Sequence, residues 1–423
     1  MEYRRRVIDG VLDDLFGALA AIALEGAKGV GKTATATQRA ATVLTLTDPR
    51  QREVVEADPD LVVTAPPPVL VDEWQLVPPV WDRIRHAVDD DATGSRYLLT
   101  GSAGPAPGIR IHSGAGRIVS LPMRPLAWSE RGITDPTVSL RVLLAGGSAT
   151  VEGPSPVDLA TYTDEILRSG FPGIRDLPPR ARQVQLDSYV ARIVDRELPE
   201  SGVAVRRPRA LRAWLSAYGA ATATDAAWST ILDAATAGDD DKPARQTVDT
   251  YREHLERIFV LDPLPAWTPT FAPLRRLTRT PKHHLVDPAI AARLVGVGAD
   301  GLLRGDGTRV ATQTGTWLGA LFESLVTQSV RVYATAADAH VGHLRTKGTD
   351  HEVDLVVEGA DRRVVAIEVK LAATVSDNDV RHLHWLGEQL GDRVADRVVV
   401  TTGPYAYRRP DGIAVVPLAL LGP

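Results

Sequence analysis

A glycine-rich segment near the N-terminus contains the residue types that bind a nucleotide. The sequence GAKGVGKT at residues 26–33 follows the apolar run AIAL and precedes a stretch rich in alanine and threonine. In the pattern G-x-x-x-x-G-K-[ST], backbone N–H groups surround the phosphates, the lysine reaches the β- and γ-phosphates, and the hydroxyl binds Mg²⁺. A glycine-rich turn without a ligand is the alternative. We expect ATP to bind at Gly26, Gly29, Gly31, Lys32 and Thr33.

Two adjacent carboxylates follow the apolar run PVLV at residues 68–71. In P-loop proteins that hydrolyse ATP, one carboxylate holds Mg²⁺ and another residue positions the attacking water. We therefore predict that Asp72 shares Mg²⁺ with Thr33 and that Glu73 is catalytic. A further apolar run at residues 96–100 leads to Ser102, whose hydroxyl would contact the γ-phosphate. A buried strand with a polar end and a plain strand-to-loop turn are the respective alternatives.

A second set of charged residues lies near the C-terminus. Asp354 begins one apolar run, and Glu368 and Lys370 stand near the end of the next. Residues two apart on a strand face the same side, so Glu368 and Lys370 project together, and antiparallel pairing would bring Asp354 to the same end. Two carboxylates would bind a divalent ion, Mg²⁺ or Mn²⁺, and the lysine would orient or activate water for phosphodiester hydrolysis. A surface salt bridge on an edge hairpin is the alternative.

The elements that must position these residues divide the chain into three parts. Short apolar runs alternating with helical patterns predict an α/β ATPase domain over residues 1–150. Residues 140–155 are small and contain glycine and proline, which is typical of a linker. Helical spacing follows, with a short apolar strand at residues 258–261, and predicts a helical, winged-helix-like domain over residues 151–280. Residues 281–423 form the third domain, again α/β.

Composition excludes several classes of protein. The 423 residues carry a net charge of −5, which excludes a histone-like role, and they contain no cysteine, which excludes disulfides and thiolate metal sites. The N-terminal run of arginines followed by LFGALAAIAL imitates a secretory signal, but acidic residues interrupt it and it leads into the glycine loop. No apolar run is long enough for a membrane span. We expect a soluble, cytoplasmic protein without membrane contact.

The N-terminal motifs, taken in order, resemble a known family. GAKGVGKT, VLVDEWQ, YLLTGSA, the Gly-Arg-Ile segment at residues 116–118 and LPMRPLAWSE are similar to the bacterial AAA+-like P-loop ATPases that carry a C-terminal domain of unknown function. The resemblance implies that Arg117 faces a nucleotide, either its own or that of a neighbouring copy. An arginine suits this role because its planar fork binds oxyanions. A surface arginine is the alternative.

The C-terminal motifs resemble the PD-(D/E)XK nuclease superfamily. Its D-x(n)-E-x-K pattern falls on Asp354, Glu368 and Lys370, which the resemblance makes catalytic, with the two carboxylates also on the metal. The helix expected at WLGALFESLV is similar to the first helix of that fold, so Glu323 would complete the metal site. A nuclease-like core can also survive as a binding platform that cuts nothing.

Three functions are therefore open. One is metal-dependent cleavage of DNA under ATP control, the second is a nucleotide-switched protein that binds DNA or a protein, and the third is an assembly ATPase in which Arg117 acts between copies. DNA is the expected partner besides ATP, with a second copy or another protein as further partners. Two basic clusters could lie along phosphates, or be solvated helix faces: Arg206, Arg207, Arg209 and Arg212, and Arg275, Arg276, Arg279 and Lys282.

Overall fold

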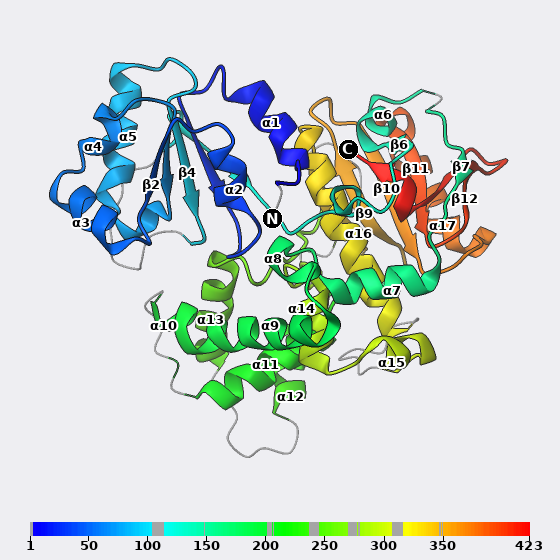
Figure 1. Ribbon diagram of the computed structural model, residues 1–423. Helices are drawn as coiled ribbons and strands as arrows, with labels where there is room; N and C mark the ends of the chain where they lie inside the picture. Colours follow the sequence, from blue (N-terminus) through cyan, green and yellow to red (C-terminus); the bar gives the residue numbers. More distant parts are fainter. Residues whose placement is uncertain are drawn as a thin grey trace.

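The computed structural model describes residues 3–103, 114–147, 149–200, 205, 207–236, 245–269, 277, 280–306, 316–346, 348 and 350–423. Figure 1 shows a parallel sheet with helices (blue to cyan), a helical part (green) and a second sheet with long helices (yellow to red). The predicted succession of an α/β part, a helical part and another α/β part is present. No helix within these residues is long and apolar enough to cross a membrane.

The N-terminal sheet has five parallel strands in the order β2-β3-β4-β1-β5. These strands are β1 (Ala21–Glu25), β2 (Thr42–Thr45), β3 (Val69–Asp72), β4 (Tyr97–Gly101) and β5 (Ile118–Pro122). The three central strands are apolar and almost wholly buried, as expected where helices cover both faces of a parallel sheet. The helices are α1 (Val7–Leu15), α2 (Lys32–Thr37), α3 (Pro49–Ala57), α4 (Leu61–Thr64) and α5 (Pro79–Asp90).

The middle part consists of helices. They are α7 (Leu159–Arg168), α8 (Pro172–Arg175), α9 (Pro179–Arg192) with a π-turn at Ile193–Glu197, α10 (Leu198–Glu200), α11 (Pro208–Ala220), α12 (Trp228–Ala235), α13 (Arg245–Arg257), α14 (Pro288–Val295) and α15 (Ala299–Arg304). Proline starts α8, α9, α11 and α14, where its missing N–H group costs no helical hydrogen bond. The strand predicted at residues 258–261 is not formed, and within it only Leu261 makes an isolated bridge, with Leu285. A second isolated bridge follows, between Leu264 and Lys282. The winged-helix interpretation remains a prediction.

The C-terminal part is a seven-stranded sheet in the order β7-β12-β13-β11-β10-β9-β8. Its strands include β8 (His340–Arg345), β9 (Glu352–Glu358), β10 (Val364–Lys370), β11 (Val394–Thr401), β12 (Tyr405–Arg408) and β13 (Ala414–Pro417). The buried helix α16 (Trp317–Ala336) packs on one face and α17 (Asp377–Leu390) on the other. Alternating residues of β10 divide between the two cores, Val365 and Ile367 with α16 and Val364 and Ala366 with α17.

The predicted domain boundary at residue 150 differs from the structure. The segment expected to be a linker forms β6 (Val138–Ser139), α6 (Leu140–Ala145) and β7 (Gly153–Pro154). β7 is the edge strand of the C-terminal sheet, paired with β12, and β6 pairs with the terminal strand β14 (Leu421–Gly422). Leu140 and Leu143 are buried in the same core as α16. Residues 138–154 therefore belong structurally to the C-terminal part.

Candidate functional site

The glycine loop connects β1 to α2 and has the backbone that only glycines readily adopt. Gly29 and Gly31 have φ angles of +84° and +105°, in the left-handed region that L side chains avoid. Gly26 has a different constraint, because a Cβ atom there would lie 2.1 Å from the Met123 carbonyl oxygen. Its lack of a side chain lets the loop pass close to the backbone after β5. The structure thus gives a reason for glycine at each of the three predicted positions.

Lys32 lies at the start of α2 with its ammonium turned back into the loop. Its Nζ donates to the Gly26 carbonyl oxygen at 2.7 Å and to the Ala27 carbonyl oxygen at 3.0 Å. Only 5% of the residue is exposed, and this burial lowers the pKa of Lys32 to about 8, although Glu73 and Asp72 act in the opposite direction. A phosphate group in the loop would give the buried ammonium an anionic partner.

The predicted carboxylates lie beside the loop because β3 and β1 end at the same edge of the sheet. Thr33 Oγ1 donates to Asp72 Oδ1 at 2.6 Å, and Thr100 Oγ1, from the strand between them, donates to the same oxygen at 2.6 Å. Hydroxyl and carboxylate oxygens are ligands that Mg²⁺ prefers. The residues present at Thr33 and Asp72 therefore fit the predicted metal.

Glu73 is held apart from Asp72 by its own contacts. Its backbone is left-handed, with φ of 57°, and its Oε2 accepts from Ser102 Oγ at 2.9 Å and from the Gln75 side chain. Ser102 was expected on the γ-phosphate, whereas in this structure its hydroxyl contacts Glu73. Thr100 and Gln75 were not predicted as site residues, although both belong to the motifs YLLTGSA and VLVDEWQ. The Ser102 hydroxyl and the Gln75 side chain hold the Glu73 carboxylate in one orientation.

Arg117 does not belong to the nucleotide site of its own chain. Ala21 pairs with Ile118 and Glu25 with Pro122 in parallel register, so Arg117 precedes β5 at the edge opposite the loop. Five residues of strand separate the two edges by roughly 16 Å. The Arg117 Nε bonds Asp89 Oδ1 at 2.6 Å on the surface. Parallel strands carry their preceding loops to the other end of the sheet, so of the two roles left open for Arg117 the one at the nucleotide of a neighbouring copy stays a prediction.

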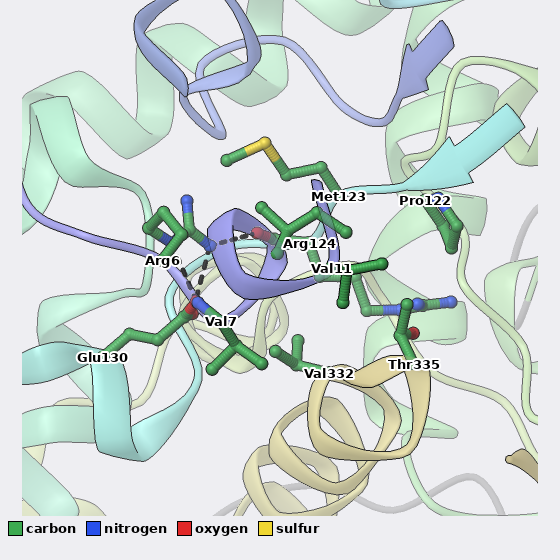
Figure 2. Close-up of a pocket in the computed structure, with 10 residues that line it drawn as sticks. Arg6, Val7, Val11, Pro122, Met123, Arg124, Glu130, Val332 and Thr335 are labelled. Atoms are coloured by element: carbon green, nitrogen blue, oxygen red, sulfur yellow. Dashed lines mark hydrogen bonds and ion pairs between the residues drawn. The ribbon is translucent and has the colours of Figure 1, made fainter. Parts of the chain in front are cut away.

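A buried ion pair that sequence analysis missed fixes the N-terminal segment against the loop (Figure 2). Arg6 Nη1 donates to the Val30 carbonyl oxygen at 2.8 Å. Nη2 donates to the Arg124 carbonyl oxygen at 2.8 Å, a bond drawn in Figure 2. Arg6 Nε lies 3.0 Å from Glu130 Oε1, and both side chains are at most 4% exposed. Glu130 also accepts from the Val7 backbone N–H at 2.7 Å. One arginine thus joins the loop, the chain after β5 and α1.

Two cavities flank the loop and include residues of the middle part. One of about 330 Å³ is lined by Lys28, Gly29, Ser102, Phe171, Tyr189 and Arg192. The other, of about 300 Å³, is lined by Tyr3, Gly31, Thr35, Gln38, Pro172 and Asp176. Tyr189 donates its hydroxyl to the Lys28 carbonyl oxygen at 3.2 Å, and Lys28 Nζ lies 2.6 Å from Glu197. The helical part therefore forms one wall of the space around the phosphate loop.

The predicted C-terminal residues also come together, in a cavity of about 880 Å³. β9 and β10 are antiparallel, and the Val369 backbone N–H donates to Asp354 Oδ2 at 3.0 Å. Lys370 Nζ lies 3.3 Å from Glu368 Oε2, as their shared face predicts. Burial and the nearby Asp354 raise the pKa of Glu368 well above its ordinary value. Glu323, on α16, lines the same cavity.

One further residue in this cavity has a different role from the one that the sequence suggested. Lys282, counted there in a basic cluster facing phosphates, is buried, with its Nζ 2.9 Å from Glu323, 2.9 Å from Glu352 and 2.8 Å from Asp354. Of the other cluster members, Arg206, Arg275, Arg276 and Arg279 lie outside the described residues. Arg212 is paired on the surface with Asp195 at 2.8 Å.

The residues present do not fit the second divalent ion that was expected here. Of the three predicted ligands, Glu323 and Asp354 both accept from the ammonium of Lys282, and Glu368 pairs with Lys370, so a positive charge already lies beside each of them. Over the part of the chain that the structure describes, no group of three or more His, Cys, Asp or Glu side chains is arranged to hold a metal ion.

Three segments of the chain match known families. Residues 19–131 match an AAA domain, residues 159–301 a domain of unknown function (DUF8612), and residues 318–421 another domain of unknown function (DUF4143). The first match supports the predicted P-loop ATPase-like N-terminal domain. The last carries no described function, and the resemblance to nucleases stays a prediction.

The chain is also similar to whole proteins. Uncharacterized proteins of Mycobacterium tuberculosis and Mycobacterium bovis are each 25% identical over 354 residues, covering 82% of this chain and 68% of the relative. Among solved structures, a Walker-type ATPase of Pyrococcus abyssi has 14% identity and a TM-score of 0.37 over 69% of this chain and 96% of that one. The ORC2 protein of Aeropyrum pernix, in ADPNP and ADP complexes, has 13% identity and a TM-score of 0.25 over 70% and 92%.

Proposed function

We propose that this chain binds and hydrolyses ATP at the loop of residues 26–33. The observation that carries the proposal is the hydrogen bond between Thr33 and Asp72, which joins the phosphate loop to the carboxylate strand. Mg²⁺, when bound there, supplies positive charge that offsets the charge on the phosphates. Lys32 binds the β- and γ-phosphates, and Glu73, oriented by Ser102, holds and polarises the attacking water.

The test separates nucleotide binding from hydrolysis. Phosphate release and binding of a fluorescent ATP analogue are measured for the parent chain, Lys32→Ala and Glu73→Gln. We expect Lys32→Ala to lose both, and Glu73→Gln to keep binding while its turnover falls by about 10²-fold or more. Retained binding in Lys32→Ala, or normal turnover in Glu73→Gln, would contradict the proposal.

We further propose that nucleotide state controls the rest of the chain through the helical part. Tyr189 and Glu197 contact Lys28 of the loop directly, so a nucleotide that moves the loop also moves α9 and the turn after it. The C-terminal cavity is lined by Arg345 and Lys370, which pair with Glu352 and Glu368, and by the exposed Arg381. Arg381 supports contact with the phosphates of DNA, the expected partner.

Of the predicted activities for this cavity, we favour binding over cleavage because Lys282 holds the carboxylates. Nicking of supercoiled DNA is assayed with Mg²⁺ or Mn²⁺, with and without ATP, alongside fluorescence anisotropy of labelled DNA. We expect ATP-dependent binding, weakened in Arg381→Ala, and no nicking. Metal-dependent nicking that Asp354→Ala and Lys370→Ala both abolish would establish a nuclease instead.

A further inference from the structure

Lys282 has the contacts of a bound cation rather than those of a surface lysine. An ammonium group has three N–H donors, and three carboxylates lie within 2.9 Å of Nζ: Glu323 from α16, and Glu352 and Asp354 from one face of β9. The side chain is 2% exposed. Nζ donates to Glu323 and Asp354, and Glu352 forms an ion pair with it, so all three contacts of the ammonium lie inside the cavity.

The charge balance of the cavity agrees with this assignment. Burial alone would lower the pKa of Lys282, but Asp354, Glu323 and Glu352 outweigh it and hold the pKa well above its ordinary value. Lys282 and Lys370 hold the pKa of Asp354 below its ordinary value, although burial acts in the opposite direction. The lysine ammonium therefore places one positive charge among the three carboxylates.

Geometry prevents the lysine and a metal ion from using the same three carboxylate oxygens at once. A Mg²⁺ ion lies 2.0–2.1 Å from its oxygen ligands and Ca²⁺ 2.3–2.6 Å. An ion bound by the same oxygens of Glu323, Glu352 and Asp354 would have to occupy the space that Nζ fills, because all three oxygens converge on that atom. The second oxygen of Asp354 already accepts from the Val369 backbone N–H.

The backbone around Lys282 keeps the ammonium in place. Lys282 N–H donates to the Leu264 carbonyl oxygen at 3.0 Å, and the Leu264 N–H donates back at 2.9 Å. The next residue is held in the same way, since His283 N–H donates to Thr224 and its carbonyl oxygen accepts from Ala223. Withdrawal of the side chain would therefore require the middle part to rearrange.

The lysine and its partners come from different segments of the chain. Lys282 lies within residues 159–301, which match one domain family, and the three carboxylates lie within residues 318–421, which match another. We propose that Lys282 is a resident cation that the middle part inserts in place of a divalent metal ion, so that the C-terminal cavity works without metal. This inference does not depend on ATP hydrolysis.

The test measures binding of Mn²⁺ alone to the full chain. Binding is monitored through the loss of the electron paramagnetic resonance signal of free Mn²⁺. All variants carry Asp72→Asn, which removes a metal ligand at the nucleotide site, and no nucleotide is added. At 1 mM Mn²⁺ we expect this parent to bind no ion. Lys282→Met should bind one ion per chain, with an affinity at least tenfold higher than that of the parent. The double variant Lys282→Met with Asp354→Asn should lose that ion. Arg304→Met, which removes a positive charge from an exposed pair with Asp306, should bind none.

Two outcomes would overturn the proposal. One is Mn²⁺ binding by the parent that Asp354→Asn abolishes, and the other is a folded Lys282→Met that gains no Mn²⁺. If Lys282→Met does not fold, the parent and Lys282→Arg decide the question. Absence of Asp354-dependent Mn²⁺ binding in both supports the proposal, and its presence in either contradicts it.

Discussion

Thr33 and Asp72 stand 39 residues apart in the chain and share a hydrogen bond of 2.6 Å. The bond joins the first turn of α2 to the end of β3, across the strand that separates β3 from β1. Thr100, from that strand, donates to the same Asp72 oxygen. Three elements therefore converge on a single carboxylate oxygen, where a phosphate-bound Mg²⁺ would be held.

Lys32 should make stability and nucleotide affinity depend on pH in opposite ways. Its folded-state pKa of about 8 lies below the ordinary value of 10.5, so the unfolded chain binds more protons between these values. The destabilising effect of the buried charge is therefore fully present below pH 8 and is relieved as pH rises to 10.5. We expect nucleotide-free Lys32→Met to be more stable than the parent at pH 7 by about 3 kcal/mol, and the gap to close by pH 10.5.

Urea unfolding at several pH values measures this difference, because other titrating groups are shared by the two chains. ATP affinity of the parent should fall above pH 8 as Lys32 loses its proton. A gap in stability that stays constant from pH 7 to pH 10.5 would show that the ammonium is not the cause.

Gly26→Ala should displace the phosphate loop. A Cβ atom at this position would meet the Met123 carbonyl oxygen at 2.1 Å, a backbone atom that cannot turn aside. We expect ATP affinity to fall by tenfold or more, measured with a fluorescent analogue. Gly10→Ala is the matched control, since nothing lies within 4 Å of its Cβ and the residue is in a helix. It should raise stability by about 0.5–1 kcal/mol and leave ATP binding unchanged.

Removing one member of the Arg6–Glu130 pair should destabilise the fold. Both side chains are at most 4% exposed, and loss of either leaves a buried charge without its partner. We expect Arg6→Ala to cost about 3–5 kcal/mol in the free energy of unfolding and to weaken ATP binding. The neighbouring Arg5→Ala breaks an exposed pair with Asp13 and should change stability by less than about 0.5 kcal/mol. Equal effects of the two variants would contradict the role of burial.

Arg117→Ala tests whether the arginine acts between copies of the chain. Arg117 lies at the far end of the sheet from its own loop, so at low protein concentration the variant should hydrolyse ATP at the parent rate. If copies assemble, the parent rate per chain rises with concentration and the Arg117→Ala rate does not. Mixing Arg117→Ala with Glu73→Gln would then restore activity. A parent rate independent of concentration excludes the trans role.

Local spacing predicted the parts of both sites that depend on local geometry. Lys32 and Thr33 follow from the loop pattern, and Glu368 and Lys370 share a face because strand residues alternate. The same reasoning distinguishes the two roles left open for Arg117, since a residue before a parallel strand lies opposite the loops that follow the strands.

Long-range packing could not be predicted in this way. Lys282 is 72 residues from Asp354, and nothing in the intervening sequence indicates that the two meet. Its position among nearby arginines favoured a phosphate-binding role, whereas the bridge between Leu264 and Lys282 turns its side chain inward. Residues 138–154 were likewise interpreted as a linker, because β6 and β7 are only two residues long and carry no strand pattern.

The interleaving of residues 138–154 with the C-terminal sheet sets an order of events during synthesis. Thr134 donates to the carbonyl oxygen of Ala419, 285 residues further along the chain. At translation rates of about 5–20 residues per second, this early segment waits on the order of 10 to 60 seconds for its partners. The P-loop sheet can form on the ribosome during that interval, but the last sheet closes only after residues 414–422 have emerged from the ribosome. The newborn protein thus holds a nucleotide-binding half before it has a complete C-terminal one.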